Sequence, residues 1–96
     1  MTVSGPLAGI KVLDLSRTLA GPLCTMILAD FGAEVLKVER PGKGDETRGF
    51  GPPYWGTESC YYLSLNRNKR AITLDLQKAE GQRIAKRLAD EADIIV

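Results

Sequence analysis

Apolar residues along this chain fall into short continuous runs and longer one-sided patterns. Residues 9–15 (GIKVLDL) carry only two charges, which is typical of a strand buried in a parallel sheet. Residues 22–32 (PLCTMILADFG) predict a helix with an apolar stripe of Leu23, Met26 and Ile27. Its proline suits a first helical turn, and its last glycine is a stop signal.

The rest of the chain continues this alternation after one polar interruption. We expect six further segments: a strand at 33–40, a Gly/Pro-rich loop at 41–57, a helix or strand at 58–66, a strand at 69–76, an amphipathic helix at 77–92, and the start of a strand at 93–96. Strand, helix and strand joined by short links predict an α/β fold with a right-handed parallel βαβ unit.

The organisation is that of a single incomplete domain over residues 1–96. Chain ends usually lie in exposed segments, whereas residues 93–96 (DIIV) have the pattern of a buried strand. We therefore interpret the chain as the N-terminal part of a larger domain.

Composition narrows the possible functions. The net charge of +1 predicts no general attraction to nucleic acid or to a membrane. The absence of histidine excludes a Ser-His-Asp triad, a Cys-His pair and a His-ligated zinc within this chain. Cys24 and Cys60 lack metal-ligand spacing, and no secretory signal is visible, so we expect a reducing, cytoplasmic location.

Two strand ends are candidate binding positions. The turn at 15–22 (LSRTLAGP) holds only Gly21 of a dinucleotide fingerprint, so a ligand loop and a tight connection both stay open. Glu39 and Arg40 end the second strand, where an acid would bind ribose hydroxyls and an arginine a phosphate. The alternative is a solvated ion pair between them, followed by an exposed turn at 43–45.

Several other residues allow a functional and a structural interpretation. Lys69 and Arg70, expected just before the third strand, could approach a phosphate or serve solubility. Cys24 is predicted to lie in the core. Gly81 is expected to cost its helix about 1 kcal/mol relative to alanine. Four aromatic residues could line an acyl or adenine pocket or close the core: Tyr54, Trp55, Tyr61 and Tyr62.

Motifs along nearly the whole chain resemble one enzyme family. They read PLAGIKVLDLSRTLAGP, LADFGAEVLKVERPGKGDETR, YYLSLNRNKRAITLDL and ADIIV. In this order and spacing they resemble the family III coenzyme A transferases of CaiB/BaiF type. The segment RGFGPPYWGTESCYYLSLNRNK is most similar to the branch acting on dicarboxylates, which includes the succinyl-CoA:glutarate type. The related α-methylacyl-CoA racemases are shorter here, so this segment favours a transferase.

The resemblance implies a fold and a chemistry. Members have a Rossmann-like core in their large domain and form interlocked homodimers. They move CoA between an acyl-CoA and a free carboxylate through anhydride and thioester intermediates on an aspartate. That aspartate lies beyond Val96 in members, so no catalytic residue is expected in this chain. CoA is a substrate, and no tightly bound cofactor, metal, nucleic acid or membrane partner is implied.

The resemblance also implies a set of CoA-binding positions. Arg40 matches an arginine that contacts the adenosine phosphate end of CoA. Leu19 and Ala20 occupy the first β-α turn, near the pantetheine. Formyl-CoA transferases carry glutamine at the Leu19 position, which points away from formyl or oxalyl specificity. The segment expected to touch the nucleotide is Leu74, Asp75, Leu76 and Gln77. An NAD(P)-type module and a structural piece without a site stay as alternatives.

Overall fold

The computed structural model describes residues 5–96 and builds them around a parallel sheet. The elements, in chain order, are β1 (Lys11–Asp14), α1 (Ala20–Asp30), β2 (Glu34–Glu39), the 3-10 helix η1 (Glu46–Gly49), β3 (Tyr54–Trp55), β4 (Glu58–Ser59), α2 (Cys60–Leu65), β5 (Lys69–Thr73), α3 (Ala79–Glu91) and β6 (Ile94–Ile95). Within the described residues, no helix is long and apolar enough to span a membrane.

The four parallel strands lie in the order β5-β2-β1-β6. Val12 of β1 pairs with Val35 of β2 on one side and with Ile94 of β6 on the other. Because the chain returns past β2 and β1 to add β6, the strand order reverses at β1, as in doubly wound folds. This confirms the predicted α/β fold with a parallel βαβ unit.

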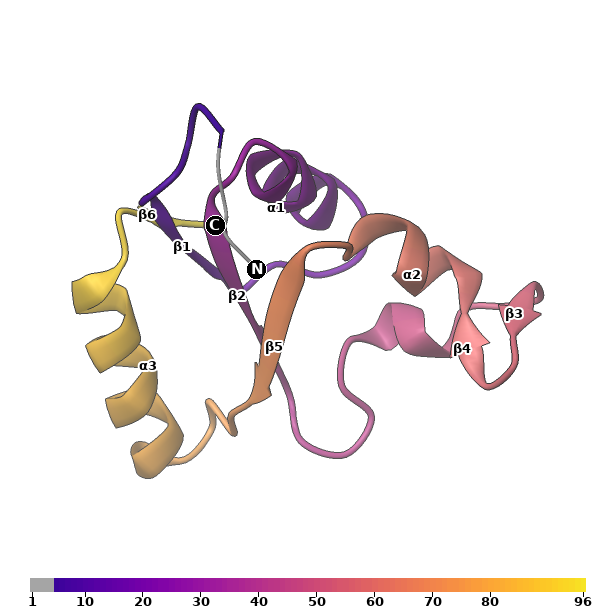
Figure 1. The fold of residues 1–96 in the computed structure, drawn as a ribbon. Helices are drawn as coiled ribbons and strands as arrows, with labels where there is room; N and C mark the ends of the chain where they lie inside the picture. Colours follow the sequence, from indigo (N-terminus) through magenta and orange to yellow (C-terminus); the bar gives the residue numbers. More distant parts are fainter. Residues whose placement is uncertain (1–4) are drawn as a thin grey trace.

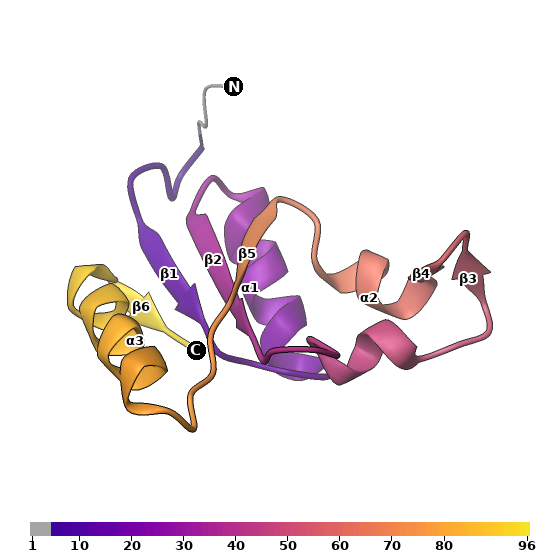
Figure 2. The same ribbon diagram turned by 90° about the horizontal axis from the view of Figure 1, so that it is seen from below.

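Helices α1 and α3 cover opposite faces of the sheet (Figures 1 and 2). Val12 and Val35 pack against Ala29 of α1 in the main apolar cluster. The other face carries Leu13 and Leu36, which border a cavity with Leu88 of α3. Alternate residues of each strand therefore point to different helices, as the period of a β-strand requires.

Helix α1 contacts the sheet through smaller residues than we predicted. Of the expected stripe, only Met26 is buried, whereas Leu23 and Ile27 are 39% and 44% exposed. Thr25 and Ala29 take the inward positions instead. Their small side chains let the helix axis approach the strands closely. The prediction that Cys24 lies in the core is also wrong, because its side chain is exposed.

The segment between β2 and β5 is more structured than a loop. It projects from the sheet as η1, the β3–β4 hairpin and α2, which are drawn from magenta to orange in Figure 1. The open choice at 58–66 resolves into both elements, because Ser59 ends β4 and its Oγ accepts from the Tyr62 amide at the start of α2. Of the four aromatic residues, only Tyr62 is buried, and Trp55 is 78% exposed.

The later elements differ from prediction at one strand end, and one glycine has a packing role. Strand β5 ends at Thr73, earlier than predicted, because the Asp75 carboxylate accepts from the Gln77 amide and turns the chain. Gly81 is buried in the first turn of α3, and a Cβ there would lie 1.9 Å from the Asp75 carbonyl oxygen. The glycine therefore permits a close approach of two backbone segments, in addition to its intrinsic cost to the helix.

Candidate functional site

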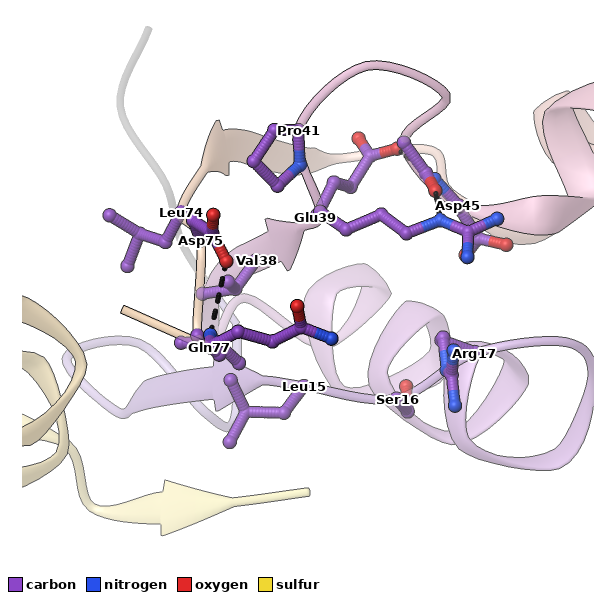
Figure 3. A pocket seen from close by; sticks show the side chains of 13 residues that line it. Leu15, Ser16, Arg17, Val38, Glu39, Pro41, Asp45, Leu74, Asp75 and Gln77 are labelled. Carbon is purple, nitrogen blue, oxygen red and sulfur yellow. Dashed lines mark hydrogen bonds between the residues drawn. The ribbon is translucent and has the colours of Figure 1, made fainter. Parts of the chain in front are cut away.

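A cavity of about 550 Å³ opens where β1, β2 and β5 end (Figure 3). Parallel strands bring their carboxyl ends to one edge of the sheet, the usual binding edge of open α/β folds. The lining residues come from the last two residues of β2 and from the segments after these three strands: Leu15, Ser16, Arg17, Val38, Glu39, Arg40, Pro41, Gly44, Asp45, Leu74, Asp75, Leu76 and Gln77.

The predicted site residues divide into two groups. Arg40 and the segment 74–77 lie together around the cavity, although they are distant in sequence. Leu19 and Ala20 do not line it, because they stand just before α1 and at its first residue. Figure 3 shows the Gln77 side chain pointing from the Asp75 turn toward the end of the cavity that holds Ser16 and Arg17.

Glu39 and Arg40 do not pair with each other. Glu39 is 7% exposed and accepts two hydrogen bonds from Arg48, at 2.6 and 2.8 Å. It also accepts from the Asp45 amide at 2.8 Å and from the Tyr62 hydroxyl at 3.2 Å. The alternative of a solvated ion pair between these two residues is therefore wrong, and the Glu39 oxygens are already occupied by protein donors.

Arg40 is exposed and keeps most of its donors free. Its Nε donates to the Gly44 carbonyl at 2.9 Å, which orients the guanidinium across the turn. Within residues 5–96, its terminal nitrogens make no hydrogen bond or ion pair. A guanidinium with a free edge can bind a phosphate through two parallel hydrogen bonds.

Arg48 controls the electrostatics beneath this turn. Its hydrogen bonds, acting against burial, lower the pKa of Glu39 to about 2. Its guanidinium also lies 3.9 Å from the centre of the Tyr62 ring. Burial, together with the Glu39 charge, raises the pKa of Tyr62 well above its usual range. No role was predicted for Arg48 from the sequence, although it lies in the GDETR motif.

Asp45 is a buried anchor rather than part of an exposed turn. Its carboxylate lies 2.8 Å from the Lys37 ammonium, and both side chains are 1% exposed. Lys37 also donates to the Ser16 carbonyl at 3.2 Å, so one buried cation contacts segments on two sides of the cavity. Burial opposes ionisation of Asp45, but bonds from Lys37 and Thr47 outweigh it and lower its pKa.

Lys69 binds buried protein groups and is not available to a ligand. Its ammonium lies 3.1 Å from the buried Asp14 carboxylate and also donates to Pro22 and Asn66. With three acceptors and a side chain that is 2% exposed, it has no donor to offer a phosphate. Burial lowers the pKa of Lys69. Arg70 is exposed and pairs with Glu34.

Arg17 lines the cavity, although no role was predicted for it from the sequence. The glycine content of the turn LSRTLAGP leaves a ligand loop and a tight connection both open. The structure brings Leu15, Ser16 and Arg17 of this turn to the cavity. The visible signal was a basic residue just after a buried strand, at the binding edge of a parallel sheet.

Comparisons with known proteins give consistent matches over nearly the whole chain. The model of CoA-transferase family III matches residues 7–96. A human succinyl-CoA:glutarate CoA-transferase is 58% identical over 91 residues, covering 95% of this chain and 21% of that protein. A formyl-CoA:oxalate CoA-transferase of Escherichia coli O139:H28 is 48% identical over 94 residues, covering 98% and 23%.

A crystal structure of a CaiB/BaiF family protein from Brucella suis matches with a TM-score of 0.89 at 44% identity. The match covers 96% of this chain and 25% of that one. The chain therefore spans about a fifth of the length of the curated relatives and a quarter of the solved structure.

Proposed function

Because the chain belongs to CoA-transferase family III, we propose that it is the N-terminal, CoA-binding portion of a longer CoA transferase. The cavity at the ends of β1, β2 and β5 binds the nucleotide end of CoA. Arg40 contacts a phosphate, and residues 74–77 contact the adenosine. The observation that carries this proposal is the meeting of Arg40 and residues 74–77 around one cavity.

The chemistry of the cavity supports a nucleotide with an added phosphate. Apolar side chains suited to a ring lie beside the polar groups: Leu15, Val38, Pro41, Leu74 and Leu76. Glu39 is neutralised by Arg48, so it does not repel an anion near Arg40. The same pairing argues against a site in which Glu39 binds free ribose hydroxyls, since its oxygens are occupied by protein donors.

We further propose that the complete protein transfers CoA from an acyl-CoA to a free carboxylate. Dicarboxylates are the acceptors to assay first. Identity of 58% with a succinyl-CoA:glutarate CoA-transferase supports that choice. An aspartate outside this chain attacks the acyl-CoA, giving an anhydride and free CoA, and CoA then displaces the first acid to form an enzyme–CoA thioester. The acceptor carboxylate attacks that thioester, and the returning CoA takes the new acyl group and frees the aspartate. The chain alone is therefore inactive. The complete enzyme is an interlocked homodimer in the cytoplasm, with CoA as substrate and no tightly bound cofactor.

The test is calorimetric titration of the complete protein with CoA. Arg40→Gln removes a charged phosphate contact worth roughly 1.5–3 kcal/mol, which is about a 10- to 150-fold rise in Kd. Lys43→Gln is the matched control, because Lys43 is exposed in the same turn and does not line the cavity. Equal affinities for both variants would contradict the assignment of Arg40.

Titration with NADP separates this proposal from a nicotinamide-nucleotide module. We expect CoA to bind and NADP not to compete with it. Tight NADP binding that is lost in Arg40→Gln would reassign the cavity to the other nucleotide.

A further inference from the structure

Arg17 is the second cationic group in the cavity. Arg17 lies in the turn after β1, and Arg40 directly follows β2. These two strands are direct neighbours in the sheet. The Arg17 side chain is exposed, and among residues 5–96 every ion pair belongs to other side chains. Figure 3 shows it beside Ser16 at the end of the cavity toward which Gln77 points.

The charges lining the cavity do not cancel. Five ionisable residues line it: Arg17, Glu39, Arg40, Asp45 and Asp75. The Glu39 carboxylate is neutralised by its ion pair with Arg48. The Asp45 carboxylate is neutralised by its ion pair with Lys37. Two arginines therefore remain against a single carboxylate, that of Asp75. A cavity with this surplus and with apolar walls favours an anionic ligand that carries a ring.

The backbone next to Arg17 is held in an unusual conformation. Thr18 has a φ of +79°, a left-handed region that a β-branched residue rarely adopts. Its hydroxyl donates to a Glu46 carboxylate oxygen at 3.0 Å. This bond ties the turn after β1 to η1, which lies beyond β2 in the chain. The turn that carries Arg17 is therefore fixed from the side of the cavity that carries Arg40.

We propose that Arg17 is a second phosphate-contacting residue of this cavity and that the Thr18–Glu46 bond positions it. The inference rests on the proposed function, because the anion is a phosphate of CoA. That phosphate is either the one on the ribose or the diphosphate that follows it. In both cases Arg17 binds it with N–H donors, as a charge-assisted contact beside that of Arg40.

The test compares Arg17→Gln with wild type in the complete protein, by titration with CoA and with dephospho-CoA. We expect the Kd for CoA to rise at least about 5-fold, with the melting temperature of the unliganded protein unchanged. If the loss is confined to CoA, Arg17 contacts the ribose phosphate. If the affinity for dephospho-CoA falls as much, Arg17 contacts the diphosphate. Arg87→Gln, an exposed change on α3, is the control and should bind like wild type.

Two results would overturn the inference: a rise in Kd for CoA of less than about 5-fold, or a parallel fall in the melting temperature. The Arg40→Gln variant separates the two proposals. If wild type binds no CoA, the proposed function itself fails. If Arg40→Gln weakens binding and Arg17→Gln does not, only the role of Arg17 fails.

The positioning role of Glu46 has its own readout. Glu46→Ala should weaken CoA binding about 3-fold, but it should add nothing once Arg17 is already glutamine. Additive losses in the double variant would show that Glu46 acts independently of Arg17 and would overturn the positioning role.

Discussion

Lys37 and Asp45 show how charged residues of this chain are used in its interior. Each side chain is 1% exposed, and each is the main electrostatic partner of the other. Forming such a pair requires two costly desolvations, so its net contribution to stability is small. Removing one partner is different, because it leaves an uncompensated charge in a dry environment.

Lys37→Met should therefore be strongly destabilising. We expect a loss of about 3–5 kcal/mol in the free energy of unfolding, as for other broken buried pairs. Denaturant unfolding of the complete protein measures it. Lys43→Met is the control, since Lys43 is exposed in the same turn, and it should change stability by less than about 0.5 kcal/mol. Similar values for both variants would contradict the buried pair.

Glu39 predicts how the fold responds to acid. Hydrogen bonds from Arg48 lower the pKa of Glu39 from 4.5 to about 2. A carboxyl with a depressed pKa in the folded state stabilises the fold fully above about pH 4.5 and loses that contribution as the pH falls toward 2. Arg48→Met removes the largest cause of this lowering, so the fall in melting temperature between these pH values should be shallower than in wild type.

Melting temperatures of wild type and Arg48→Met from pH 6.5 to 2.5 provide this comparison. Other paired carboxylates, such as Asp14 and Asp45, also have lowered pKa values and contribute equally to both curves. The informative quantity is therefore the difference between the two curves. Parallel curves through the acid range would contradict the Glu39–Arg48 interaction.

At the scale of elements, Gly81 couples α3 to the cavity. It stands in the first turn of α3 against the Asp75 backbone, and Asp75 lines the cavity. A Cβ at 1.9 Å from a carbonyl oxygen cannot be accommodated without moving one of the two segments. The position of α3 and the shape of residues 74–77 are therefore set together.

Gly81→Ala should reduce both stability and CoA affinity, although alanine is the better helix former. Overpacking costs about 1–3 kcal/mol and exceeds the gain of about 1 kcal/mol from helix propensity. Thermal unfolding and CoA titration of the complete protein measure the two effects. Gly49→Ala, where a Cβ meets nothing within 4 Å, is the control. A more stable Gly81→Ala variant with normal affinity would contradict this account.

Elements were predictable where a local pattern sufficed. The strands β1 and β2 and the helix between them follow from apolar runs and stop signals that act within a few residues. The inward face of α1 was not predictable from hydrophobicity, since Thr25 and Ala29 are small enough for close packing while Leu23 and Ile27 remain outside. Side-chain volume at the contact with the sheet determines which face of α1 is buried. The volume that fits there depends on the facing strands.

The site was predictable in part, for a similar reason. Family resemblance led to the CoA-transferase family, which the family match over residues 7–96 confirms. The partner of Glu39 was not predictable, because several cations lie nearby in sequence. The turn at Gly44, which has a φ of +68°, brings Arg48 to Glu39 and turns Arg40 away from it. Pairing across a turn depends on backbone geometry that charge patterns do not record.

At the scale of the whole molecule, one edge of the sheet collects all the proposed ligand contacts. Three segments meet there, after β1, after β2 and after β5. The buried pair of Lys37 and Asp45 joins β2 to the turn that follows it. The buried pair of Lys69 and Asp14 joins the start of β5 to the end of β1. Among the described residues, Arg17 and Arg40 line the cavity without an ion pair. The buried Lys37 and Lys69 are instead satisfied by protein groups. This division between scaffold and contact residues underlies the proposal that the cavity binds CoA.

Hydrogen exchange of the complete protein, with and without CoA, tests that central claim most directly. We predict that CoA slows exchange of backbone amides in the three segments 15–17, 40–45 and 74–77, and that Arg40→Gln weakens this protection at equal CoA concentration. Residues 82–90 of α3 serve as an internal reference that should not change. CoA protection confined to other parts of the protein, with these three segments unaffected, would contradict the account.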